Sequence, residues 1–288
     1  MDECPPRHHF GPREAVRPGS EFLGLPELQA VRAASLLSPE LDASADLLIA
    51  KVVLSPGETI PLHSHPGRGE AVFLVHGAIM AQRGRGKAEV RARGAAYFPA
   101  DVAHGIEALA DVESEFLMCY ARADISRDVR SELVDPEQDQ SGWPNPNVIK
   151  GSSLEYRWAL SEDFEPWVPV EPTKGWALRM KYLFDPVRGA PDLVVGVGYT
   201  EPHHHYTLHR HEPAELYHIL DGRGMLRVGE RTYEIGRGST VYVPAMEVHG
   251  IDTHDSFLND FWVYGVDECG SGWTWEAVEP IVDMPSPG

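Results

Sequence analysis

Two patterns of histidine and glutamate have the residue types and the spacing of a metal site. The first comprises His63, His65, Glu70 and His104, and the second comprises His209, His211, Glu215 and His249. Residues i and i+2 of a strand share a face, so the histidines of each His-x-His pair should point the same way. Three neutral imidazoles and one carboxylate suit a divalent first-row metal such as Fe, Mn, Ni, Cu or Zn. The sequence therefore predicts up to two such ions per chain.

The two patterns belong to a longer internal repeat. Glu70 and Glu215 are 145 residues apart, and so are Phe116 and Phe261. This offset is about half of the 288 residues, so the chain is predicted to contain two copies of one domain. The stretch between them is polar and rich in proline and acids, as linkers often are. The predicted divisions are 1–125 for the first domain, 126–153 for the linker and 154–288 for the second domain.

Short apolar runs bounded by glycine and proline recur along the chain. They include Leu47–Leu54, Ala71–Val75, Leu193–Val197 and Thr240–Val243. Such runs are typical of an all-β sandwich or barrel. Helical patterns are few, and short helices are expected only at Glu27–Leu37 and Asp128–Leu133.

Composition limits the partners. The chain has 25 Lys and Arg against 44 Asp and Glu, a net charge of −19, which disfavours nucleic acid and anionic lipid. No apolar run is long enough to span a membrane, and the first residues lack the apolar region of a secretory signal. The three cysteines are far apart, so no disulfide or cysteine-based zinc site is expected. We expect a cytoplasmic protein, a monomer or homodimer, with a small-molecule substrate.

The spacing of the histidines carries a family resemblance. The first copy reads G-x5-HxH-x4-E-x6-G from Gly57 to Gly77, and the second reads HxH-x3-E-x6-G from His209 to Gly222. Each is followed by P-x4-H, and together they resemble the two motifs of the cupin superfamily. Two copies in one chain resemble a bicupin, over residues 45–121 and 190–265. The resemblance implies two tandem double-stranded β-helix (jelly-roll) barrels, with metal-ligand roles for the eight residues named above.

The chain departs from the family motifs at three positions. Asp101, Met246 and His203 stand where the motifs have glycine. We therefore expect turns of a different shape at these positions.

The residues beside the two glutamates differ between the copies. Counting along a strand from Glu215, Tyr217 shares the inward face and His218 points outward. The residue that matches Tyr217 in the first copy, two positions after Glu70, is Val72. Only the second copy therefore has a phenol for proton transfer near its metal, which favours it as the reactive site with Tyr217 as the catalytic residue.

Three kinds of function remain open. The leading expectation is a dioxygenase, an oxidoreductase acting on a small, oxygen-bearing, anionic metabolite, because similar bicupins include quercetin-type dioxygenases. The first alternative is a non-redox lyase, decarboxylase or hydrolase with Tyr217 as base. It rests on the stretch from His211 to Tyr217, which is similar to the metal motif of cupin dimethylsulfoniopropionate lyases, and on the bicupin oxalate decarboxylases and ureidoglycine aminohydrolases. The second alternative is a non-enzymatic, metabolite-binding bicupin.

Overall fold

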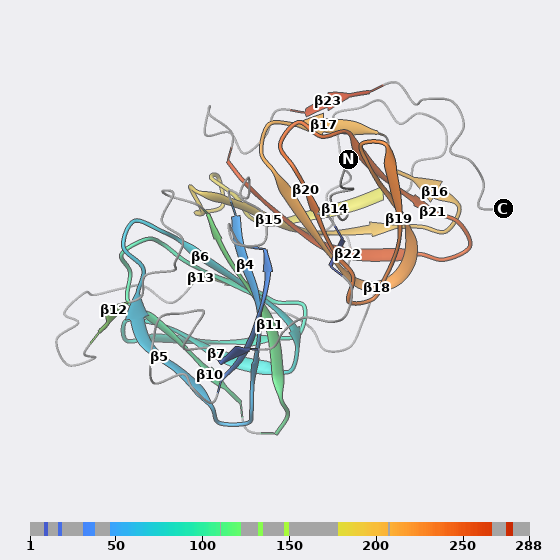
Figure 1. Ribbon diagram of the computed structural model, residues 1–288. Helices are drawn as coiled ribbons and strands as arrows, with labels where there is room; N and C mark the ends of the chain where they lie inside the picture. Colours follow the sequence, from blue (N-terminus) through green and yellow to red (C-terminus); the bar gives the residue numbers. More distant parts are fainter. Residues whose placement is uncertain are drawn as a thin grey trace.

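The protein forms two β-barrels that lie side by side (Figure 1). The computed structural model describes residues 9–10, 17–18, 31–37, 47–109, 111–121, 132–134, 147–149, 178–206, 208–266 and 275–278. All regular elements in these ranges are strands, which confirms the all-β, two-barrel expectation. Within them, no helix is long and apolar enough to cross a membrane.

The first barrel consists of two sheets. Its strands are β2 (Arg17–Pro18), β3 (Arg32–Leu37), β4 (Leu47–Leu54), β5 (Thr59–Ser64), β6 (Glu70–His76), β7 (Ala78–Arg83), β8 (Gly86–Arg91), β9 (Ala95–Phe98), β10 (His104–Ala108), β11 (Ser114–Ala121), β12 (Glu132–Leu133) and β13 (Asn147–Ile149). One sheet has the order β13-β9-β6-β11-β4-β3-β2, and the other has the order β12-β5-β10-β7-β8.

The second barrel repeats this plan with one continuous, curled sheet. Its strands are β1 (His9–Phe10), β14 (Leu178–Phe184), β15 (Leu193–Thr200), β16 (His204–His205), β17 (His209–His211), β18 (Glu215–Val228), β19 (Arg231–Gly236), β20 (Thr240–Val243), β21 (His249–Thr253), β22 (Leu258–Gly265) and β23 (Trp275–Ala277). The main path is β14-β15-β22-β18-β21-β17-β23. The long strand β18 joins the two sides, since its first half pairs with β22 and its second half with β19 and β21.

Each barrel turns its corner at a glycine of the repeated motif. Gly77 separates β6 from β7 with φ = 86°, and Gly222 lies within β18 with φ = 77°. A Cβ on Gly77 would lie 2.6 Å from the Glu113 carbonyl oxygen, and one on Gly222 would lie 1.9 Å from the Phe257 carbonyl oxygen. Glycine is needed at both positions because the backbone is left-handed and the next strand passes close by.

Three apolar cores hold the molecule together. Two of them fill the barrels, and the third lies between the barrels and contains residues from both. In this interface the Phe73 and Phe261 rings are 4.7 Å apart. The Asp192 carboxylate of the second half accepts hydrogen bonds from the Gly69 N–H and from the Tyr97 hydroxyl. The two barrels are therefore joined by buried apolar surface and by a specific polar contact.

Some details differ from the expectations. The helix expected at Glu27–Leu37 is wrong over residues 32–37, which form strand β3 and pair with β4. Most of these side chains are buried against the two barrels, so tertiary packing overrides the weak local preference. The last two residues of Asp128–Leu133 form strand β12, and the others lie outside the described residues. His218 does point away from its own barrel, but it is buried because the first barrel covers that side.

Several short strands pair with a different barrel than the predicted domain divisions suggest. β12 and β13 fall within the predicted linker and pair with β5 and β9 of the first barrel. β1 lies near the beginning of the chain but pairs with β20 of the second barrel. The boundaries 1–125, 126–153 and 154–288 stay predictions.

Candidate metal centres

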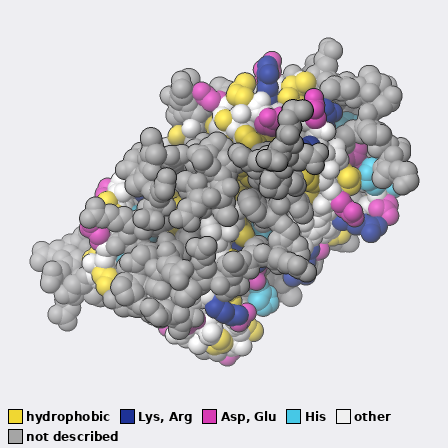
Figure 2. Space-filling view, viewed as in Figure 1, with side chains coloured by type: hydrophobic (Ala, Val, Ile, Leu, Met, Phe, Trp, Pro, Cys, Tyr) yellow, Lys and Arg dark blue, Asp and Glu magenta, His cyan; other side chains and the backbone are white. Residues whose placement is uncertain are grey.

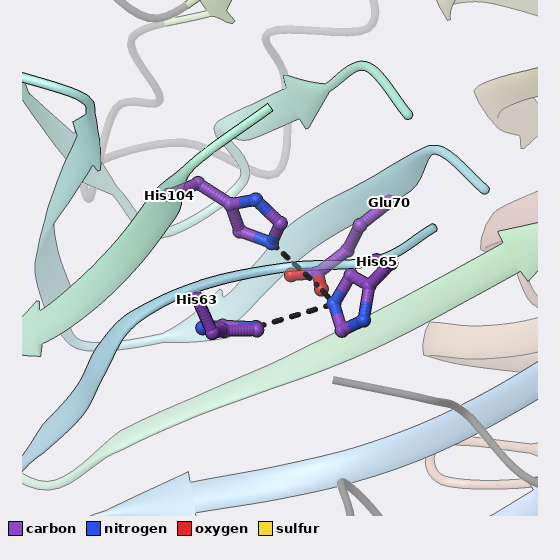
Figure 3. Close-up of side chains that lie close together, drawn as sticks. All are labelled: His63, His65, Glu70 and His104. Carbon is purple, nitrogen blue, oxygen red and sulfur yellow. Dashed lines mark hydrogen bonds and ion pairs between the residues drawn. The ribbon is translucent and has the colours of Figure 1, made fainter. Parts of the chain in front are cut away.

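The structure brings each predicted set of four residues together inside its own barrel. The ligand atoms within each set all lie within 4.8 Å of one another, and every member of both sets is buried. Figure 3 shows the first set, in which the three imidazoles and the carboxylate converge from three strand segments. The two sets are thus in different barrels, and each is complete.

The ends of three strand segments supply each set. In the first barrel, Glu70 begins β6 and His104 begins β10, while His63 lies near the end of β5 directly opposite His104. In the second barrel, His209 lies directly opposite His249 in the same way. Antiparallel pairing therefore places residues together that are about 40 positions apart in sequence.

The three departures from the family motifs keep the backbone shape of a glycine. Asp101, Met246 and His203 have φ values of 63°, 61° and 60°. The Asp101 N–H donates to the His65 carbonyl at 3.0 Å, and the Met246 N–H donates to the His211 carbonyl at 2.8 Å. The expectation of differently shaped turns is therefore wrong, because these hydrogen bonds hold the left-handed turn despite the side chain. Such strain costs about 1–3 kcal/mol per residue and tends to cluster at functional sites.

Hydrogen bonds to backbone carbonyls orient four of the imidazoles. In each case the distance runs from the imidazole Nδ1 to a backbone carbonyl oxygen. It is 2.7 Å from His63 to Pro61, 2.7 Å from His104 to Val102, 2.7 Å from His211 to Pro213 and 2.9 Å from His249 to Glu247. A neutral imidazole that donates from Nδ1 leaves the Nε2 lone pair free. In every case Nε2 then faces the centre of the set, which is the arrangement that metal-binding histidines adopt.

The charges of the two sites suit a cation. Burial raises the pKa of Glu70, but the neighbouring His104 and His65 outweigh it and hold that pKa well below its usual range. For Glu215 burial acts in the same direction, and the neighbouring His211 and His249 outweigh it and lower the pKa to about 2. Burial lowers the pKa of His63 to about 3. At neutral pH the carboxylates are ionised and His63 is neutral, and these are the forms that bind metal.

One atom of the first set tests whether an ion fits. Glu70 Oε1 is buried, and no described residue gives it a hydrogen bond, whereas Oε2 lies 2.9 Å from His65 Nε2. A buried carboxylate oxygen without a partner is costly, and a cation at the centre of the set would satisfy it. The chemistry of the donors and this orphaned oxygen together support a divalent metal in the protein.

A tyrosine contacts the carboxylate in each barrel, but it comes from a different position. In the first barrel the Tyr120 hydroxyl, on β11, donates to Glu70 Oε2 at 2.7 Å. In the second barrel Tyr217 faces the interior as predicted and forms a hydrogen bond with Glu215. Val72 faces the interior of the first barrel, also as predicted. Tyr120 was missed because its contact depends on the pairing of β11 with β6, which no local pattern reveals.

The strand opposite the glutamate shows a larger difference between the barrels. Glu70 pairs with Tyr120 and Glu215 pairs with Tyr264, and counting back along β11 and β22 matches Phe116 with Asp260. By the same register, Met118 of the first barrel corresponds to Trp262 of the second. The second barrel therefore has a carboxylate at one position where the first has a phenylalanine, and neither Asp260 nor Trp262 was predicted. Arg68, buried next to Tyr120 in the first barrel, was also missed.

Sequence comparison agrees with this geometry. The cupin domain family matches residues 50–120 and 197–256, one segment in each barrel and each containing one complete set of four. The chain is a bicupin. The resemblance seen in its motifs is thereby confirmed.

Two curated proteins are related to the bicupin over part of its length. It is 35% identical to the dimethylsulfoniopropionate lyase DddW of Ruegeria pomeroyi over 82 residues, which are 28% of this chain and 53% of the lyase. It is 36% identical to an uncharacterized protein of Methanocaldococcus jannaschii over 62 residues, 21% of this chain and 46% of that protein. The bicupin thus spans about half the length of these relatives.

Solved oxalate decarboxylases share the two-barrel architecture. The Bacillus subtilis enzyme superposes with a TM-score of 0.64 at 17% identity, covering 94% of the bicupin and 79% of that chain. The Lactobacillus farciminis enzyme gives 0.65 at 16% identity, covering 96% and 90%. At this identity the likeness establishes the fold. The dimethylsulfoniopropionate lyase and the oxalate decarboxylases are, by their names, enzymes that act on small molecules.

Proposed function

We propose that this bicupin is a metal-dependent lyase and that its second barrel eliminates a β-substituent from a small carboxylate. One observation carries the proposal: Tyr217 faces the interior and is hydrogen-bonded to Glu215 at the complete set of four, where the first barrel has Val72. The similarity to a dimethylsulfoniopropionate lyase supports it. The expected dioxygenase chemistry has no comparable support, so elimination replaces it as the preferred reaction.

The roles of the residues follow from their positions. His209, His211, Glu215 and His249 would hold a first-row divalent ion, which supplies a Lewis acid that makes the proton next to the substrate carboxylate more acidic. The Tyr217 oxygen accepts this proton, the C–H electron pair forms a carbon–carbon double bond, and the β-substituent leaves with its own bonding pair. Burial and then the charge of Glu215 raise the pKa of Tyr217 well above its usual value. A cation sharing the charge of Glu215 acts in the opposite direction and favours the basic phenolate.

The test uses metal-loaded, full-length protein with dimethylsulfoniopropionate as the probe. We expect release of dimethyl sulfide and acrylate in equal amounts, at the same rate in air and under argon. Tyr217→Phe should lower kcat at least a hundredfold with the metal content unchanged, since general bases typically contribute 10²–10⁴. Tyr233→Phe, at a partly buried tyrosine on β19, is the matched control and should keep full activity. Consumption of oxygen in step with turnover, or full activity in Tyr217→Phe, would overturn the proposal.

A further inference from the structure

A buried carboxylate in the second barrel has no charged partner among the described residues. Asp260 lies on β22 and is 2% exposed. Its hydrogen bond comes from the Gly198 backbone, and no ion pair of the described residues includes it. Carboxylates in protein interiors are normally paired with a cation or several donors. The position of Asp260 therefore calls for a partner that the chain itself does not supply.

Asp260 faces the same interior as the metal set. Alternate residues of β22 point into the barrel, where Leu258, Trp262 and Tyr264 belong to its core. Asp260 shares their face, and a Cβ on Gly198 of the neighbouring strand would lie 2.6 Å from its Oδ1. The charge of Asp260 acts on the Tyr217 hydroxyl. The carboxylate thus lies close enough to Tyr217 and Glu215 to interact electrostatically with both.

Two aromatic residues follow Asp260 on the inward face of β22. The Trp262 and Tyr264 rings are stacked with centroids 5.4 Å apart, and Tyr182 meets Trp262 edge-on at 5.2 Å. Glycine at position 196 makes room for this arrangement, because a Cβ there would lie 2.0 Å from the Trp262 ring. Aromatic ring faces attract ammonium and other onium ions in proteins.

The first barrel shows that this charge is not required by the fold. The residue that matches Asp260 there is Phe116, which is fully buried in an apolar core. The same architecture therefore accepts a phenylalanine at this position. A carboxylate that replaces it loses solvation, and burial followed by the charge of Glu215 raises the pKa of Asp260 to about 7. Such an unfavourable group indicates a role in ligand binding.

We propose that Asp260 is a specificity-determining residue of the second barrel, and that it pairs with a positively charged onium group of the substrate. The carboxylate end of the same substrate would lie at the metal. The ligand class is then a small zwitterion whose positive and negative groups are separated by a short carbon chain. This inference rests on the proposed function only for the position of the substrate carboxylate.

A pair of ligands of the same shape tests this without any turnover. 3-(Trimethylammonio)propionate and 4,4-dimethylpentanoate differ in one atom, a charged nitrogen against a neutral carbon. Calorimetric titration of the metal-loaded protein should show at least tenfold tighter binding of the ammonium compound. Asp260→Asn should reduce this preference to about onefold while leaving the affinity for dimethylpentanoate and the metal content unchanged. Asp255→Asn, which removes the same charge at a side chain that is 68% exposed, should keep the preference.

A second variant covers the case in which Asp260→Asn does not fold. Gly198→Ala keeps the carboxylate but displaces it, and it should also weaken the preference for the ammonium ligand at least threefold. Equal binding of the two ligands by the wild type, or an undiminished preference in Asp260→Asn or Gly198→Ala, would overturn the inference. These outcomes are independent of lyase activity: a preference without turnover refutes only the proposed function, and turnover without a preference refutes only the role of Asp260.

Discussion

His218 should make the folded protein sensitive to acid, although it lies outside both metal sets. It is 3% exposed at the junction of the barrels, with Nδ1 2.8 Å from the Thr240 hydroxyl oxygen. Burial, and then the charges of Lys51 and Arg93 from the first barrel, lower its pKa from 6.5 to about 3. In the folded state the imidazole therefore stays neutral well below pH 6.

The size of the effect follows from the difference in pKa between the two states. Above pH 6.5 neither state protonates His218, so it adds no pH dependence. Below pH 6.5 the unfolded chain takes up a proton that the folded chain refuses, and the free energy of unfolding falls by about 1.4 kcal/mol per pH unit. Between pH 6.5 and 4.5 the loss is about 3 kcal/mol, and the decline ends near the folded pKa of about 3.

The measurement compares His218→Asn with the wild type. Asparagine does not titrate and can keep the hydrogen bond to Thr240, so its unfolding free energy should decline less with acid, by about 3 kcal/mol at pH 4.5. Urea unfolding followed by circular dichroism, after metal removal by a chelator, gives both curves. His254→Asn, at a side chain that is 51% exposed, should follow the wild type. Parallel curves for His218→Asn and the wild type would show that the folded imidazole accepts a proton, and would refute the reasoning.

Three further predictions concern the metal sites and their packing. Elemental analysis should find about two divalent ions per chain, and about one in either His63→Ala or His209→Ala, since each variant breaks one set; two ions in both variants would argue against these ligands. Asp192→Ala removes the carboxylate that accepts a hydrogen bond from the Gly69 N–H, directly before Glu70. Chelator competition should therefore show about tenfold weaker metal binding at the first site and unchanged metal affinity at the second. Gly196→Ala drives a methyl group into the Trp262 ring and should lower the free energy of unfolding by about 2 kcal/mol in urea titrations, whereas an unchanged value would mean that the ring moves freely.

The His-x-His pairs and the glutamates of the two sets could be predicted because their spacing is local, whereas His104 and His249 were predicted from the P-x4-H pattern of the family resemblance. His63 and His65 lie two apart on one strand, and the repeat carries the pattern to His209 and His211. The inward face of Tyr217 also follows from alternation along a single strand. None of these inferences requires knowing which strands are neighbours.

Asp260 could not be found in this way, and the repeat itself shows why. The sequence offset of 145 matches Phe116 with Phe261, but Phe116 faces the interior of the first barrel and Phe261 faces the interface. The register of the strands matches Phe116 with Asp260 instead, one position earlier. Since a slip of one residue exchanges the two faces of a strand, the sequence repeat hides the residue that faces the site.

The short strand β1 has a consequence for any attempt to separate the halves. His9 and Phe10 pair with Val241 and Thr240 of the second barrel, although they precede the whole of the first barrel in the chain. A cut in the segment between the barrels would leave β1 attached to the first half. It would also expose to solvent, on both fragments, the apolar surface that is buried between the barrels. The second half is therefore not an autonomous module, and grafting it onto another scaffold would require transplanting β1 as well.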